Sequence, residues 1–269
     1  MTSNPIPRLG FGTYGRRGPE GVDAMLTALE TGYRHLDTAQ DYENETEVGQ
    51  AVARSGLPRE SIFVTTKIAP RHYPRGSLLP SLRESLDKLS LDQVDLTLLH
   101  WPSPNDEVPL AHYVEQLAEA RSSRLSRLIG VSNFTIDLLE QTIAMLGKDA
   151  IANNQFELNP HMQNKRLADF CQSKGILVTC YLPIAHGTLG DDPILQDIAR
   201  SHDATVAQIA IAFELAKGYA AIPTSGKPER IRENYAASKI VLTPQQIASI
   251  ATLDQGKRRI DPEWGPKWD

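Results

Sequence analysis

Four side chains of complementary chemistry stand at or near the ends of apolar runs in the first hundred residues. They are a carboxylate, a phenol, an amine and an imidazole: Asp37, Tyr42, Lys67 and His100. An ammonium beside a phenol stabilises the phenolate and lowers the phenol's pKa from its ordinary value of about 10. The set therefore predicts either acid catalysis by Tyr42 or a Schiff base on Lys67, as in barrel aldolases. A carboxylate paired with Lys67 would keep the amine charged, which favours the phenol.

The sequence shows no spacing typical of a metal site or a serine nucleophile. The patterns His-x-His, His-Glu-x-x-His and Gly-x-Ser-x-Gly do not occur in the 269 residues. Cys171 and Cys180 are the only cysteines, too few for a thiolate zinc site or a disulfide scaffold. We therefore expect no metal.

Short apolar runs recur along the chain at intervals of about 30 residues, the length of one strand, one helix and two loops. They predict eight strands, at 33–38, 62–67, 94–100, 128–132, 152–157, 177–182, 220–224 and 240–242. The segments between them carry apolar residues at helical spacing, as Val22, Met25 and Leu29 do ahead of Gly32. Strands alternating with helices predict an α/β fold, a (β/α)8 TIM barrel that forms one domain over residues 1–269.

An open, doubly wound sheet is the alternative architecture. Gly10-Phe-Gly-Thr-Tyr-Gly15 matches the glycine pattern of dinucleotide-binding loops, but that pattern requires a preceding strand. Only nine residues precede it, and they include Pro5 and Pro7. We interpret the glycines as a tight turn.

Polar side chains stand at the ends of seven consecutive predicted strands. They are Asp37, Lys67, His100, Ser132 with Asn133, Gln155 with Glu157, Tyr181, and Thr224 with Ser225. Each alone could cap a helix or lie solvated at a rim. In a TIM barrel, however, catalytic residues lie at the carboxyl ends of the strands. The recurrence therefore predicts one site at this face of the barrel.

The chain resembles the aldo-keto reductases over nearly its whole length. The matching stretches are 10–14, 32–39, 42–45, 65–67, 94–102, 129–134, 154–157 and 222–234, among them Gly32-Tyr-Arg-His-Leu-Asp-Thr-Ala39 and Ile129-Gly-Val-Ser-Asn-Phe134. The resemblance is greatest to bacterial members that reduce keto-sugar acids or methylglyoxal. It implies NADPH-dependent reduction of a carbonyl to an alcohol. The expected substrate is an aldehyde, an α-dicarbonyl such as methylglyoxal, or a keto-sugar acid such as 2,5-diketo-D-gluconate.

The same resemblance implies a role for each matching residue. Tyr42 would donate a proton to the carbonyl oxygen, Asp37 and Lys67 would tune it, and His100 would orient the carbonyl. The nicotinamide would be held through its carboxamide and stacked on one ring, by Ser132, Asn133, Gln155 and Tyr181. Further cofactor contacts would come from Gly12, Thr13, Thr224, Ser225, Lys227, Arg230, Glu233 and Asn234, and pocket walls from Tyr14, His100, Trp101, Trp264 and Trp268.

The segment 225–234 predicts where the cofactor phosphates bind. It opens a helix, with Pro228 suited to the first turn, and a helix start attracts phosphate. Lys227 and Arg230 would contact a 2′-phosphate, which favours NADP over NAD. Thr224 stands where the family usually has a lysine. Ala69 replaces a usual pocket aromatic, which suggests a wider pocket.

Composition bounds the remaining possibilities. A net charge of −5 does not favour binding to nucleic acid. The apolar runs are far shorter than the roughly 20 residues that span a bilayer. The start, Met1-Thr-Ser-Asn4, shows no charged and then apolar pattern, so we do not expect a cleaved secretory signal. We expect a cytoplasmic enzyme, and the family likeness suggests a monomer. A redox sensor that holds NADP with negligible turnover is the alternative, although the complete catalytic set argues against it.

Overall fold

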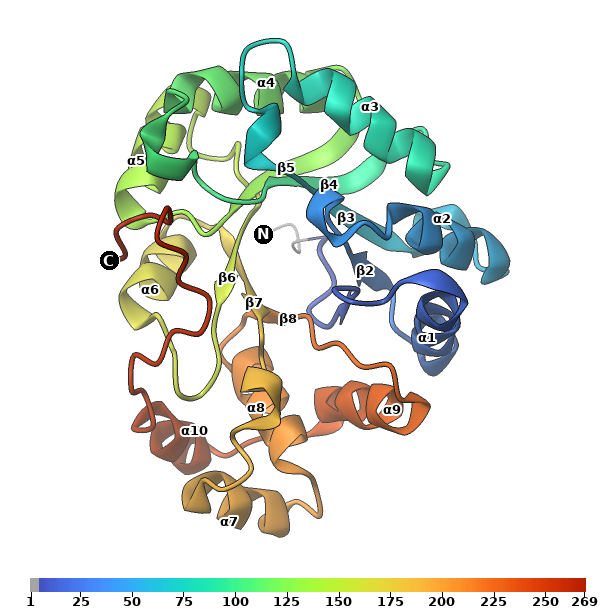
Figure 1. The fold of residues 1–269 in the computed structure, drawn as a ribbon. Helices are drawn as coiled ribbons and strands as arrows, with labels where there is room; N and C mark the ends of the chain where they lie inside the picture. The colour runs from blue at the N-terminus through green and yellow to red at the C-terminus, as the bar shows by residue number, and fades with distance from the viewer. Residues whose placement is uncertain (1–4) are drawn as a thin grey trace.

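The computed structural model describes residues 5–269, whose eight parallel strands curl into a barrel (Figure 1). Our expectation about a secretory signal concerns residues 1–4, which lie outside the described residues. In the sheet each strand neighbours the next along the chain. The strands are β1 (Phe11–Gly12), β2 (His35–Asp37), β3 (Phe63–Ile68), β4 (Val94–Leu99), β5 (Ser126–Ser132), β6 (Asn153–Glu157), β7 (Leu177–Tyr181) and β8 (Ala220–Ala221). The predicted TIM barrel is confirmed.

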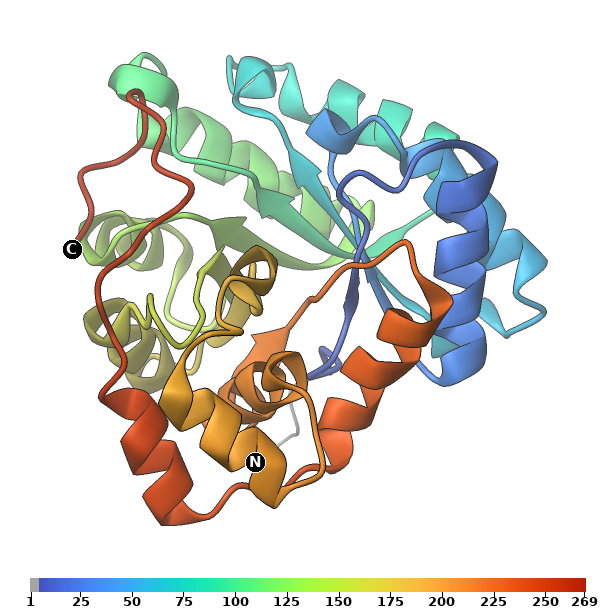
Figure 2. The ribbon, with the colours of Figure 1, turned by 60° about the horizontal axis from the view of Figure 1, so that its bottom comes forward.

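Helices cover the outside of the barrel (Figure 2). The α-helices are α1 (Gly18–Thr31), α2 (Glu45–Arg54), α3 (Leu78–Leu89), α4 (Leu110–Ser122), α5 (Ile136–Leu146), α6 (Lys165–Ser173), α7 (Pro193–Ser201), α8 (Val206–Ala216), α9 (Pro228–Ala236) and α10 (Pro244–Ala251). The short 3₁₀ turns are η1 (Gln40–Tyr42), η2 (Arg59–Ser61), η3 (Pro70–His72), η4 (Pro104–Asp106), η5 (Ala185–Gly187) and η6 (Ala237–Lys239). Both α7 and α8 lie between β7 and β8, so this crossover is the longest of the barrel.

The helices form where the apolar spacing predicts them. In α1, Val22, Met25 and Leu29 are buried against the barrel. Gly32 then ends the helix with a φ of 124°, a conformation that a residue with a Cβ rarely adopts. Strands β3 and β4 are buried at every position, because helices cover one face and apolar side chains fill the barrel on the other.

The prediction of an eighth strand at 240–242 is wrong. This segment is an extended connection between η6 and α10. Its apolar residue Leu242 is buried in a separate cluster that α7, α8 and α10 form outside the barrel. Burial in a helical layer and burial in a sheet leave the same apolar signature in so short a run.

The missing strand is β1, in the glycine segment that we interpreted only as a turn. Gly10 N–H donates to the Ala221 carbonyl at 2.9 Å and Leu9 pairs with Ala221, which closes the barrel between β8 and β1. A Cβ on Gly12 would lie 2.7 Å from the Ile222 carbonyl oxygen, so the close approach of these segments requires glycine. The turn begins only at Tyr14 and Gly15.

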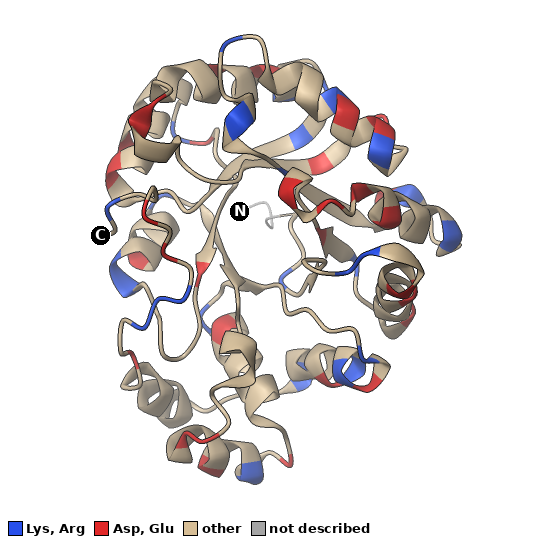
Figure 3. Ribbon diagram, in the orientation of Figure 1, with Lys and Arg blue, Asp and Glu red and all other residues tan. Residues whose placement is uncertain are grey.

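The charged residues lie mostly on the outer helices, where both signs are intermixed (Figure 3). None of the helices formed by residues 5–269 is long and apolar enough to cross a membrane. The strand register gathers the predicted polar residues at one end of the barrel: Gly12 pairs with Asp37, Ser132 with Gln155, and Glu157 with Tyr181.

Candidate active site

Lys67 lies at the centre of a buried polar network, and its side chain is fully buried. Its ammonium donates to Asp37 Oδ1 at 2.5 Å, to the Thr38 carbonyl at 3.0 Å and to Tyr42 Oη at 3.0 Å. Burial alone would lower the pKa of Lys67, but Asp37 and Tyr42 raise it more, so the amine stays charged. Each of its three N–H groups has a partner. The ammonium therefore has neither a lone pair nor a free N–H for a Schiff base.

The phenol of Tyr42 faces a cavity beside this network. Because its oxygen accepts a hydrogen bond from Lys67, its own O–H is free to point elsewhere. Burial raises the pKa of Tyr42, and this effect outweighs the lowering by Lys67. Our expectation that the ammonium would lower the phenol's pKa below its ordinary value is thus wrong, because the cost of burying a phenolate is larger. A raised pKa keeps the phenol protonated and ready to donate.

The imidazole of His100 forms another wall of the same cavity. Its ring centroid lies 5.7 Å from that of Tyr42, and its side chain is 13% exposed. Nδ1 lies 3.1 Å from Asp41 Oδ2. Burial lowers the pKa of His100, and the Asp41 carboxylate only partly offsets this.

The cavity has a volume of about 850 Å³, in the range of small-ligand sites. Predicted site residues line much of it: Gly12, Tyr14, Asp37, Tyr42, His100, Trp101, Ser132, Asn133, Gln155, Tyr181, Thr224 and Trp264. Further lining residues were not predicted: Asp41, Pro70, Pro104, Leu182, His186, Ile222 and Ile260. The last group comes mostly from loops and from the carboxyl-terminal segment, where no strand periodicity points to a site.

The four residues predicted around the nicotinamide form one hydrogen-bonded group on the cavity wall. Asn133 donates to Ser132 Oγ at 3.1 Å and accepts from Tyr181 Oη at 2.9 Å. Gln155 donates from its amide nitrogen to Asp37 Oδ2 at 2.8 Å, which ties this group to the buried network. The side-chain oxygens of Asn133 and Gln155 keep capacity to accept further hydrogen bonds, which suits the amide nitrogen of a carboxamide.

The predicted phosphate contacts lie on the connection from β8 to α9 and at the start of α9, and Thr224 among them also lines the cavity. The helix begins at Pro228, as predicted, and Lys227 and Arg230 are exposed. Thr13 is buried behind the wall, donating to the Asp37 carbonyl, while Asn234 is buried and Glu233 exposed on α9. After the roles that the family resemblance implies for these regions, we refer to Asp37, Tyr42, Lys67 and His100 as the reducing end of the site. We refer to Thr224, Ser225, Lys227 and Arg230, together with the neighbouring Arg16, as the phosphate end.

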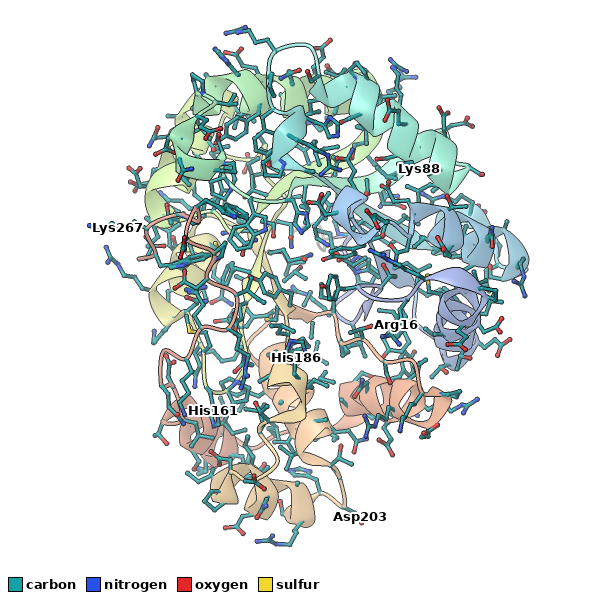
Figure 4. All side chains as sticks on the ribbon, viewed as in Figure 1. Arg16, Lys88, His161, His186, Asp203 and Lys267 are labelled. Atoms are coloured by element: carbon teal, nitrogen blue, oxygen red, sulfur yellow. The ribbon has the colours of Figure 1, made fainter. Side chains whose placement is uncertain are left out.

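Arg16 belongs to the phosphate end, although sequence reasoning missed it. It follows β1 and lies beside the connection from β8 to α9 (Figure 4), where a Cβ on Gly226 would collide with its guanidinium. Arg16 Nε and Thr224 Oγ1 are buried without a hydrogen-bond partner among the described residues. Buried polar atoms of this kind are costly unless a ligand or water satisfies them. The feature of the sequence that could have identified Arg16 is its position directly after the glycine segment Gly10–Gly15.

The carboxyl-terminal segment closes one side of the cavity. The buried carboxylate of Glu157 accepts from the backbone N–H groups of Arg259 and Ile260, each at 2.9 Å. Trp264 then packs edge-on against Trp101 with ring centroids 5.2 Å apart, and Trp268 lies 6.1 Å from Trp101. Both terminal tryptophans thus pack around Trp101, and Trp264 itself lines the cavity.

Comparison with known proteins gives consistent matches. Residues 8–255 match the model of the Aldo/keto reductase family. The chain is 46% identical to methylglyoxal reductase DkgB of Yersinia pestis, over 98% of this chain and 99% of that protein. It is 38% identical to 2,5-diketo-D-gluconic acid reductase B of a Corynebacterium species, over 94% and 91%. A solved aldo-keto reductase from a Medee basin deep-sea metagenome library superposes with a TM-score of 0.91 at 33% identity, over 97% of this chain and 96% of that one.

Proposed function

The chain belongs to the aldo/keto reductase family and is an oxidoreductase that reduces carbonyl groups, and on this premise we propose that Tyr42 protonates the carbonyl oxygen, with NADPH as the cofactor. One observation carries the assignment of Tyr42. Lys67 donates to its oxygen at 3.0 Å, so the phenolic proton is left to face the cavity. Negative charge develops on the substrate oxygen as the carbonyl is reduced, and a donor held in place stabilises it.

The buried network supplies the rigidity that this role requires. Asp37 accepts from Lys67 through Oδ1 and from Gln155 through Oδ2, so rotation of either partner would leave one oxygen of a buried carboxylate without a donor. Lys67 in turn fixes the phenol oxygen. Asp37 and Lys67 are thus proposed to position Tyr42, and the Lys67 charge stabilises the phenolate that remains after the proton has been given up.

The unpaired groups at the phosphate end support a phosphate-bearing cofactor. Arg16 and Thr224 have buried polar atoms without partners in the part of the chain that the structure describes, and Lys227 and Arg230 are exposed cations at a helix start. The presence of several cationic and hydrogen-bonding groups favours NADPH, which carries one more phosphate than NADH. When bound, the nicotinamide supplies the hydride, and the acceptor oxygens of Asn133 and Gln155 are proposed to hold its carboxamide.

The cavity favours a small uncharged carbonyl. Among the described residues, its lining includes Asp37 and Asp41 and neither Lys nor Arg. The apolar walls come from Trp101, Trp264 and Ile260. A substrate carboxylate would find no strong cation there, so we propose that α-dicarbonyls such as methylglyoxal and simple aldehydes are preferred to keto-sugar acids.

A substrate panel tests this proposal. Loss of reduced-nicotinamide absorbance is followed with NADPH and with NADH, each against methylglyoxal, an aromatic aldehyde and 2,5-diketo-D-gluconate. We expect NADPH to be oxidised, with the highest kcat/KM for methylglyoxal. Tight NADPH binding without turnover of any substrate would contradict the enzymatic role and favour a sensor. A preference for the keto-sugar acid would overturn the argument from the charge of the cavity.

A further inference from the structure

Asp41 is an acidic residue at the cavity that the catalytic set does not include. It precedes Tyr42 in η1, and its Oδ2 lies 3.1 Å from His100 Nδ1. Its other oxygen pairs with the guanidinium of Arg71 from η3. The carboxylate is 37% exposed, whereas the imidazole is 13% exposed. Asp41 therefore lies between a surface cation and a buried ring that faces the substrate.

The hydrogen bond between Asp41 and His100 decides where the ring carries its proton. The hydrogen bond from His100, together with the Arg71 guanidinium, lowers the pKa of Asp41 to about 2 against the effect of burial. The carboxylate is therefore ionised at working pH and can only accept, so Nδ1 must carry a proton. A neutral imidazole has one N–H. A neutral His100 bonded to Asp41 thus has a bare Nε2, which cannot donate to a carbonyl oxygen.

On the basis of the proposed function, we propose that Asp41 is a positioning residue: its carboxylate holds the proton of His100 on Nδ1, so that Nε2 donates to the substrate oxygen only when the ring is an imidazolium. Tyr42 remains the proton donor, and His100 contributes a hydrogen bond whose strength depends on its charge. A charged donor makes a hydrogen bond roughly twice as strong as a neutral one. Asp41 thereby makes reduction depend on pH.

The charged groups around His100 fix the direction of that dependence. Asp41 and Tyr42 come from η1, Asp37 from β2, Lys67 from β3 and Arg71, behind Asp41, from η3. Burial and the Lys67 ammonium lower the pKa of His100, and the carboxylates of Asp41 and Asp37 offset this only in part. The imidazolium is therefore lost as the pH rises through a value below the ordinary one of about 6.5. kcat/KM should fall over the same range.

The test compares the pH profiles of wild-type protein and Asp41→Asn with NADPH and methylglyoxal, between about pH 5.5 and 9. In the wild type we expect kcat/KM to fall by up to about tenfold per pH unit above the pKa of His100. In Asp41→Asn the amide can donate to Nδ1, which places the ring proton on Nε2 at all pH values. Its profile should be much flatter than that of the wild type, because Nε2 keeps its proton when the ring becomes neutral, and at alkaline pH it should be the faster enzyme.

Arg71→Gln is the matched control, because it removes the other partner of Asp41 and leaves the bond to His100 in place. We expect it to keep the wild-type slope. The Kd of NADPH, measured by quenching of protein fluorescence, should be the same in all three proteins. Identical slopes in wild type and Asp41→Asn would overturn the proposal.

A second readout depends neither on turnover nor on the folding of Asp41→Asn. Nitrogen-15 NMR of the wild-type imidazoles, with His100 assigned by its absence in His100→Gln, reports which ring nitrogen carries the proton. At alkaline pH we expect the proton of His100 on Nδ1. A proton on Nε2 would overturn the role of Asp41 even if the reductase assignment holds, and a proton on Nδ1 would support it even if methylglyoxal is not reduced.

Discussion

At the reducing end of the site the charged side chains of Lys67 and Asp37 are buried and paired with each other. At the phosphate end, by contrast, the basic side chains are exposed or have atoms without a hydrogen-bond partner among the described residues. Lys67 and Asp37 are almost fully buried, and their hydrogen bonds are made to each other and to Thr38, Tyr42 and Gln155. Arg230 and Lys227 are exposed, and Arg16 Nε has no hydrogen-bond partner within residues 5–269. The hydrogen bonds of the reducing end are thus formed within the protein, while we propose that the cofactor supplies the missing partners at the phosphate end. Substitutions at the reducing end should affect the rate of reduction or the stability of the fold. Substitutions at the phosphate end should affect the affinity for the cofactor.

The largest effect is expected from Tyr42→Phe. Without the phenolic proton, kcat/KM should fall by about 10²- to 10⁴-fold, the usual contribution of a general acid. The Kd of NADPH should hardly change, because the phenol acts on the carbonyl. Tyr14→Phe is the matched control, since its ring packs 5.2 Å from that of Tyr42 but lies outside the buried network. Wild-type rates in Tyr42→Phe would refute the role assigned to this residue.

Breaking the buried ion pair should affect stability as well as rate. Lys67→Met leaves the Asp37 carboxylate buried without its cation, a change that costs about 3–5 kcal/mol in comparable cases. The midpoint of urea unfolding should fall accordingly. Adding Asp37→Asn to this variant removes the unpaired charge and should recover part of the loss. A Lys67→Met protein as stable as the wild type would show that the pair is not coupled as the contacts indicate.

At the phosphate end, Arg230→Ala should weaken NADPH binding by about five- to twentyfold, because one charge-assisted contact from an exposed side chain is lost. NADH binding should change little, since it lacks the 2′-phosphate. Arg232→Ala, on the exposed side of the same helix, serves as the control. Fluorescence titration with both cofactors gives the values. An equal loss for NADPH and NADH would place Arg230 on a phosphate that both cofactors share.

The smallest effect is expected where the terminal segment is anchored. Glu157→Gln weakens the hydrogen bonds to the N–H groups of Arg259 and Ile260. The loss is about 1 kcal/mol, which lowers the equilibrium constant for anchoring of the terminal segment roughly fivefold. We expect KM for the largest substrate to rise several-fold with kcat retained. Glu263→Gln, an exposed carboxylate of the same segment, is the control. A loss of kcat instead of a rise in KM would mean that the segment supports the reducing end itself.

The two ends also differed in how far the sequence predicted them. Asp37, Lys67 and Gln155 lie at the ends of strands with clear apolar periodicity, so the barrel rule places them together. Arg16 follows a strand of only two residues, β1, which is too short to show any periodicity. Its proximity to Gly226 depends on closure of the barrel, which brings the first and last strands side by side.

Two further features depend on the three-dimensional surroundings of a side chain and could not be predicted from residue types. The direction of the Tyr42 pKa shift reflects a balance between desolvation and the charge of Lys67, and only the structure shows that desolvation is larger. The role of Asp41 depends on an orientation toward His100 rather than toward solvent. By contrast, Gly32 and Pro228 mark the end of α1 and the start of α9 as predicted, because local conformation alone decides them.

The most direct test of the account is transfer of deuterium from NADPH, labelled at the transferring position, to methylglyoxal, measured by mass spectrometry for wild type and Tyr42→Phe side by side. We predict that the wild type yields an alcohol carrying one deuterium on the former carbonyl carbon, and that Tyr42→Phe, although it binds the cofactor equally well, yields almost none in the same time. Label transfer at equal rates in both proteins would contradict proton donation by Tyr42. An unlabelled alcohol from the wild type would contradict hydride transfer from the nicotinamide.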